Sequence, residues 1–189
     1  MRKINIAPLL VNHAEELTDD IVNLYHKNVI DCVAFSFTLV PEGVPAFDKS
    51  AEYSRCFKIF QKLLKEKGVP TGILLQATWG HGGAQDEPTD FQRIRRIDGG
   101  SQYTMCPEGE PFRDYIRKAV MTAAATKPDF FMLDDDTRFI SCRSACFCPL
   151  HTALFNKKTG RNLSSDELRE AVKSSPEDAR IMDASCRNP

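Results

Sequence analysis

The sequence has no long apolar run, no Gly-rich phosphate loop and no excess of one charge. No run approaches the roughly 20 apolar residues of a membrane span. The apolar part of the N-terminal MRKINIAPLLVNH is short, contains Asn5 and Pro8 and has no clear cleavage site. We therefore expect a first strand, not a signal peptide, and a cytoplasmic protein. The net charge of −1 gives no indication of binding to nucleic acid or to an anionic membrane.

The number of cysteines in the sequence is informative. There are seven cysteines, and an odd number without a signal peptide argues against a closed disulfide framework.

The chain has 189 residues, of which 42% are hydrophobic and 27% are charged. This length and composition are enough for one globular domain with its own core.

Apolar strands alternate with amphipathic helices along the chain. The predicted strands are residues 4–11, 31–40, 71–80 and 128–133, and the predicted helices are 14–27, 51–67, 111–126, 151–158 and 164–172. This order predicts a single α/β domain over 1–189, with a long loop excursion at 81–110 and an irregular C-terminal tail at 174–189. The parallel units fit an open doubly wound sheet or the N-terminal half of a TIM (β/α)8 barrel. VNHAEE, not a Gly-rich fingerprint, follows the first strand, which disfavours nucleotide binding.

Three acids follow the predicted strand 128–133. Asp134, Asp135 and Asp136 come directly after its last apolar residue, and Arg138 lies close behind them. Ligands bind beyond the carboxyl ends of parallel strands. Clustered carboxylates repel one another, so we expect at least one to have the raised pKa of a general acid unless a cation is near, and Arg138 could be that cation. Asp136 and Asp135 are therefore catalytic candidates, and Asp134 and Arg138 are substrate-binding candidates. The alternative is helix capping and solvated turn charge.

The third predicted strand also ends in candidate binding residues. Trp79 is the only tryptophan and lies where a sugar ring could stack on it, and His81 follows in the loop. The alternatives are core packing for Trp79 and a solvent-facing turn for His81.

The segment SACFCPLH has the spacing of a metal site. Cys146 and Cys148 are two residues apart and His151 is three further on, which is close spacing of the soft ligands that zinc prefers. Cys106 is the best candidate for the fourth ligand, because we expect both segments to follow strand ends on the same face; Cys142 competes for that role. A closed set of four would be a structural zinc site, and the alternative is a group of reduced thiols without metal.

The run CPEGEPFRDYIRKAV, a strand ending in acids, and then CFCPLHTALFNKKTG together resemble glycoside hydrolase family 42, the β-galactosidases. The resemblance covers about residues 104–170. In that family a Cys-Pro segment opens the third helix, and an Asp-Asn-Glu triplet ends the fourth strand, its Glu being the general acid/base. A Cys-x-Cys-x-x-Cys cluster then binds zinc together with the earlier cysteine. The corresponding residues are Cys106, Asp134-Asp135-Asp136, Cys146, Cys148 and His151.

This chain departs from the family pattern in several places. His151 replaces a cysteine, Asp136 replaces the catalytic Glu, and Asp135 replaces an Asn that would contact the sugar. The LDDD-x-R segment also resembles an uncharacterised branch of barrel hydrolases. The resemblance implies a nucleophile on a seventh strand, about 5 Å from the acid/base in retaining enzymes. We count four strands, so we expect part of a barrel that binds a carbohydrate and forms a homo-oligomer or pairs with the remainder of the barrel.

Two further hypotheses remain open. One is an α/β binding module that is cross-linked by zinc and whose carboxylate oxygens bind Mg²⁺ or Ca²⁺. The other is a metal-dependent sugar-processing barrel without glycosidase activity.

Overall fold

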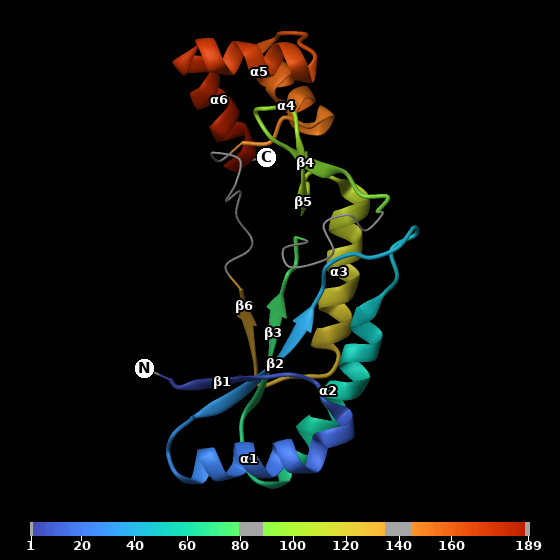
Figure 1. Cartoon of the computed structure of the whole chain (residues 1–189), viewed down its shortest axis with the longest axis vertical. Coiled ribbons are helices and arrows are strands. Elements are labelled where there is room, and N and C mark those ends of the chain that lie inside the picture. Colours follow the sequence, from blue (N-terminus) through green and yellow to red (C-terminus); the bar gives the residue numbers. More distant parts are fainter. Residues whose placement is uncertain (1, 80–88, 135–144, 188–189) are drawn as a thin grey trace. The chain divides into compact units, whose positions relative to one another are not determined.

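The computed structural model describes residues 2–79, 89–134 and 145–187 (Figure 1). Its helices and strands in chain order are β1 (Ile4–Ala7), the 3-10 turn η1 (Val11–His13), α1 (Ala14–His26), β2 (Cys32–Thr38), α2 (Lys49–Glu66), β3 (Thr71–Gln76), β4 (Arg93–Arg95), β5 (Ser101–Met105), α3 (Glu110–Ala124), β6 (Phe130–Leu133), α4 (Pro149–Thr159), α5 (Ser165–Ser174) and α6 (Pro176–Arg187). None of these described helices is long and apolar enough to cross a membrane.

The chain packs as two compact units, where the sequence predicts a single domain. The sheet unit comprises Met1–Val40, Phe47–Thr78 and Tyr115–Asp135, and the hairpin unit comprises Pro41–Ala46, Trp79–Asp114 and Asp136–Pro189. Long helix α3 contributes its first residues to the hairpin unit and the rest to the sheet unit.

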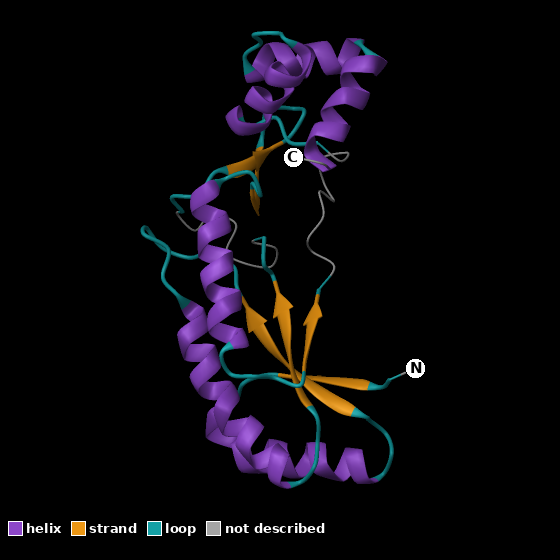
Figure 2. Ribbon diagram, turned by 180° about the vertical axis from the view of Figure 1, so that it is seen from behind, coloured by secondary structure: helices purple, strands orange, loops and turns teal. Residues whose placement is uncertain are grey.

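The sheet unit is built on a four-stranded parallel sheet in the order β1-β2-β3-β6. Figure 2 shows the strands as a fan with the helices packed beside it. This arrangement confirms the prediction of a parallel α/β fold.

Alternate residues of the central strands face the helices. Phe35 and Phe37 of β2 are fully buried and contact the aromatic stripe of α2. The Phe35 ring lies 4.7 Å from the Phe60 ring and 6.0 Å from the Phe57 ring, measured between centroids. Since burial of each such side chain contributes about 1.5–3 kcal/mol, this aromatic layer fixes α2 on the sheet.

The predicted ends of α2 are close to the observed ones. Asp48 caps its N-terminus by accepting a hydrogen bond from the Ser50 backbone N–H at 3.0 Å. The chain leaves the helix through Gly68, whose φ of 72° is the left-handed conformation that glycine favours.

The other face of the sheet places Gly72 of β3 beside Phe130 of β6. The two residues are in register, and a Cβ added to Gly72 would overlap the Phe130 ring. The absence of a side chain at Gly72 therefore lets the ring of its neighbour lie across β3.

We predict that Gly72→Ala destabilises the protein by about 1–3 kcal/mol, because the added methyl displaces the Phe130 ring. Chemical denaturation monitored by circular dichroism measures the change. Combining Gly72→Ala with Phe130→Leu should restore part of the loss, since the smaller side chain leaves room. A Gly72→Ala protein as stable as the parent would contradict this account.

The hairpin unit combines the antiparallel pair β4–β5 with helices α4, α5 and α6. Its buried core consists of a few large side chains from the hairpin and the helices: Ile94, Phe147, Phe155, Leu168 and Met182. Helix α4 ends at Gly160, with φ of 69°, and Ser164 and Glu167 form the capping box that the sequence predicts for α5.

Two segments of this unit differ from the sequence prediction. The predicted loop excursion at 81–110 contains the strands β4 and β5. In β4, the buried Ile94 lies between two arginines. The prediction of an irregular tail at 174–189 is wrong, because Pro176–Arg187 form α6. Met182 and Cys186 are four residues apart, so they share one side of that helix, and both side chains are buried.

Candidate metal centre

Strand β4 brings two distant segments together through backbone hydrogen bonds. The carbonyl of Gln92, just before β4, accepts a hydrogen bond from the Cys106 N–H at 2.7 Å. The carbonyl of Arg95, at the other end of β4, accepts one from the Phe147 N–H at 2.8 Å. Cys106 and the segment around Phe147 thus lie side by side although about forty residues separate them.

The start of α4 positions the other ligands. Cys148 is the N-cap residue and Pro149 begins the helix, where a missing N–H is tolerated. His151 lies in the first turn, so its side chain projects back toward Cys148. The helix start therefore fixes the backbone of Cys148 and His151, and the third potential ligand, Cys146, comes from the segment just before it.

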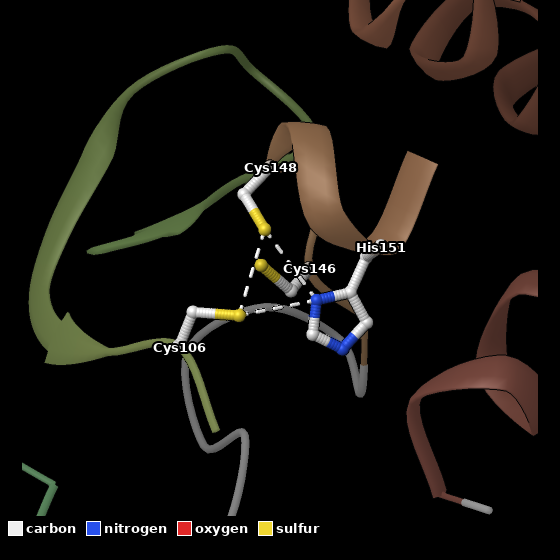
Figure 3. A group of neighbouring side chains, drawn as sticks. All are labelled: Cys106, Cys146, Cys148 and His151. Carbon is white, nitrogen blue, oxygen red and sulfur yellow. Dashed lines mark hydrogen bonds between the residues drawn. The ribbon is translucent and has the colours of Figure 1, made fainter. Parts of the chain in front are cut away.

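Cys106, Cys146, Cys148 and His151 form a closed group of soft ligands (Figure 3). Their four potential ligand atoms all lie within 4.8 Å of one another. The His151 Nδ1 atom is 3.3 Å from the Cys106 sulfur and 3.5 Å from the Cys148 sulfur. The sulfurs of Cys106 and Cys148 are 3.5 Å apart, well beyond the roughly 2.05 Å of a disulfide.

All four side chains are fully buried, each with 0% of its surface exposed. No other group of three or more His, Cys, Asp or Glu side chains within the described ranges has a geometry that could hold a metal ion. A metal bound here would be shielded from bulk water.

The electrostatics of the cluster favour a thiolate next to a cation. The pKa of the Cys148 thiol is lowered because its sulfur accepts hydrogen bonds from Cys106 and then Cys146. The pKa of the Cys146 thiol is raised because it donates hydrogen bonds to the sulfurs of Cys106 and Cys148. Burial opposes the charged form of His151, but hydrogen bonds to the Cys106 and Cys148 sulfurs raise its pKa to about 12. Because ligand thiols must lose their protons to bind a metal, binding of a divalent cation at this point would release protons.

Cys186 of α6 lies directly behind this cluster and was missed by the sequence analysis. Its sulfur accepts a hydrogen bond from the Cys146 backbone N–H at 3.3 Å, and its contact with His151 also raises the pKa of that imidazole. The only sequence signal is the spacing of Met182 and Cys186 after a proline and an acidic turn, the pattern of a helix start.

The acidic candidates are only partly within the described residues. Asp134 is half-buried at the carboxyl end of β6, and its N–H donates to the Leu75 carbonyl at 3.1 Å, which continues the pairing with β3. The catalytic candidates Asp135 and Asp136 lie outside the described residues, as do Arg138, His81 and the competing ligand Cys142.

Trp79 lies in the hairpin unit and is half-buried. Its carbonyl accepts a hydrogen bond from the Met105 N–H at 2.6 Å. The backbone of Trp79 is therefore fixed next to the residue that precedes the potential ligand Cys106.

Comparison with protein-family models, with curated proteins and with solved structures finds no match to this chain.

We predict that Cys186→Ala lowers the stability of the hairpin unit by about 1–3 kcal/mol, since the buried Cys146 N–H loses its acceptor. Cys186→Ser keeps an acceptor and should lose less. Thermal melting of both variants gives the comparison, with Cys32→Ala as a control for loss of a buried thiol in the sheet unit. Equal melting of the two Cys186 variants would argue against a role for the hydrogen bond.

Proposed function

We propose that Cys106, Cys146, Cys148 and His151 bind one Zn²⁺ and that this ion holds the hairpin unit together. The observation that carries the proposal is the convergence of four fully buried ligand atoms within 4.8 Å. Three thiolates and one imidazole are a common ligand set of structural zinc.

The distances support a tetrahedral ion. Zinc–sulfur bonds of about 2.3 Å and zinc–nitrogen bonds of about 2.0–2.1 Å place neighbouring ligand atoms roughly 3.5–3.8 Å apart in a tetrahedron. The sulfur–sulfur distance of 3.5 Å and the sulfur–nitrogen distances of 3.3 and 3.5 Å are near that range. Since protein side chains supply all four ligands, no position remains for a water or a substrate, so the ion is structural.

We predict one zinc per chain in the purified protein, measured by elemental analysis. Cys148→Ser should lose the metal, whereas Cys56→Ser, which removes a buried thiol of the sheet unit, should retain it. Replacement by Co²⁺ should give the absorption of a tetrahedral site with three thiolates. Metal-free wild-type protein that takes up neither ion would overturn the proposal.

We also predict that a strong chelator unfolds the hairpin unit selectively. Structural zinc contributes about 10–16 kcal/mol of apparent binding free energy in small zinc domains, so its removal removes most of the stability there. Hydrogen exchange measured by mass spectrometry should speed up in β4, β5 and α4–α6, while β1–β3 stay protected. Uniform exchange across both units after chelation would contradict a local role for the ion.

We further propose that the chain belongs to a glycoside-hydrolase-like barrel. Its parallel strands follow one another in the order β1-β2-β3-β6, without the reversal of strand order found in doubly wound sheets. The edge strands expose apolar side chains, with Ile6 of β1 52% exposed and Leu133 of β6 67% exposed. Further barrel strands, or a second copy of the chain, would cover such edges.

In this proposal the acids after β6 perform the chemistry. Asp136 would donate a proton to the glycosidic oxygen, with Asp135 beside it, while Asp134 and Arg138 would hold sugar hydroxyls. Trp79 would stack on the ring, near His81. The position of Asp134 at the carboxyl end of β6 supports this assignment, because barrel enzymes bind their substrates at that end.

We predict that β-galactosides change the fluorescence of Trp79, the only tryptophan. In the complete barrel, which would supply the nucleophile, Asp136→Asn should abolish turnover of aryl galactosides and leave this binding signal intact, since it removes the proton donor and keeps the shape. Asp19→Asn, on the exposed surface of α1, is the matched control. Turnover unaffected by Asp136→Asn would refute the assignment, and a Ca²⁺-dependent melting shift without sugar binding would favour a binding module.

A further inference from the structure

The sheet unit has a cavity of about 630 Å³ beside the C-terminal half of α2. It lies against the turns that lead into β3 and β6, at the end of the sheet opposite to Asp134. Four of the side chains that line it are lysines: Lys58, Lys62, Lys65 and Lys127.

Three of these lysines share one face of α2. Lys58, Lys62 and Lys65 are spaced by four and three residues, a spacing that places side chains next to one another and makes like charges destabilising. In the part of the chain that the structure describes, none of the four lysines forms an ion pair. Their positive charges therefore lie around the cavity without an ionic partner among the described residues.

Asp129 is the only carboxylate among the described residues that line the cavity. Its oxygen accepts a hydrogen bond from the Thr71 N–H at 2.7 Å, and its own N–H donates to the Thr71 carbonyl at 2.9 Å. These bonds join the two turns through Asp129. Its single negative charge does not balance the four lysines, so the described lining of the cavity has an excess of positive charge.

The helix dipole explains only part of this pattern. Cations are favoured within the last turn of a helix, and Lys65 lies there at the end of α2. Lys58 and Lys62 precede the last turn, so the dipole gives no reason for their charge.

The walls of the cavity are held in place by the fold. The Gln61 side chain on α2 donates a hydrogen bond to the Lys127 carbonyl at 3.0 Å, which ties the turn after α3 to the helix. Val69, 2% exposed, and Pro70 add an apolar surface. A bound anion would meet ammonium groups from two sides without rearrangement of the backbone.

We propose that this cavity binds a small, multiply charged anion of the phosphate class, such as pyrophosphate or a phosphate ester. Lysine ammonium groups are strong donors to phosphate oxygens, and a multivalent anion would offset the mutual repulsion of the three α2 lysines. The apolar surface of Val69 and Pro70 could contact a small organic group attached to the anion. The site is independent of the zinc cluster and of the acids after β6.

The test is a titration of the full chain with sodium pyrophosphate at constant ionic strength, followed by amide chemical shifts. Shifts should concentrate in residues 65–71 and 126–129. The variant Lys58→Gln, Lys62→Gln, Lys65→Gln should bind at least about tenfold more weakly, because each charged hydrogen bond contributes on that scale. Glutamine is uncharged and has nearly the helix propensity of lysine, so the fold of α2 is maintained.

A matched variant controls for net charge. Lys27→Gln, Lys157→Gln, Lys158→Gln removes the same charge from exposed positions outside the cavity and should bind pyrophosphate as the parent does. The proposal is overturned if the parent shows no localised shifts, if both triple variants weaken binding equally, or if sodium acetate produces the same shifts.

Discussion

The pair of hydrogen bonds between β4 and the segments at Cys106 and Phe147 is the constraint on which the hairpin unit depends. These bonds place potential ligands from two distant segments around one point. The hydrogen bond from the Cys146 N–H to the Cys186 sulfur connects α6 to the same cluster. The apolar core of this unit is small, and small cores are commonly supplemented by a metal or a disulfide. No disulfide links the described cysteines, and the cluster of potential metal ligands is the cross-link that we propose for this unit.

The sheet unit was predictable because its residues repeat with clear periods. Buried strands such as β2 and amphipathic helices such as α2 carry a local signal that tertiary packing did not override. The hairpin unit gave weaker signals. Strand β4 is three residues long with one buried side chain, Ile94, between arginines, and α6 has few apolar residues in a polar sequence. Their structure follows from contacts with α4 and α5, which a local pattern does not contain.

The ligand set was predictable for a partly different reason. The spacing of Cys146, Cys148 and His151 is local and follows from the start of α4. The choice of Cys106 rested on two segments that follow strand ends on one face of a parallel sheet. In the structure Cys106 instead follows β5 of the antiparallel hairpin, and it is β4 that brings it to the cluster. The structure therefore brings the four predicted residues together, but through a different topology from the one expected.

The proposed zinc site would separate stability from chemistry in this chain. A metal with four buried protein ligands has no free position, so it cannot activate water or polarise a substrate. Under this proposal, any reaction would depend on side chains outside the cluster, and the acids after β6 begin in the other compact unit, at Asp134. Loss of a proposed ligand would then affect folding of the hairpin unit, whereas loss of a proposed catalytic acid would affect chemistry alone. The two kinds of variant are thus distinguishable by whether the melting temperature or the turnover changes.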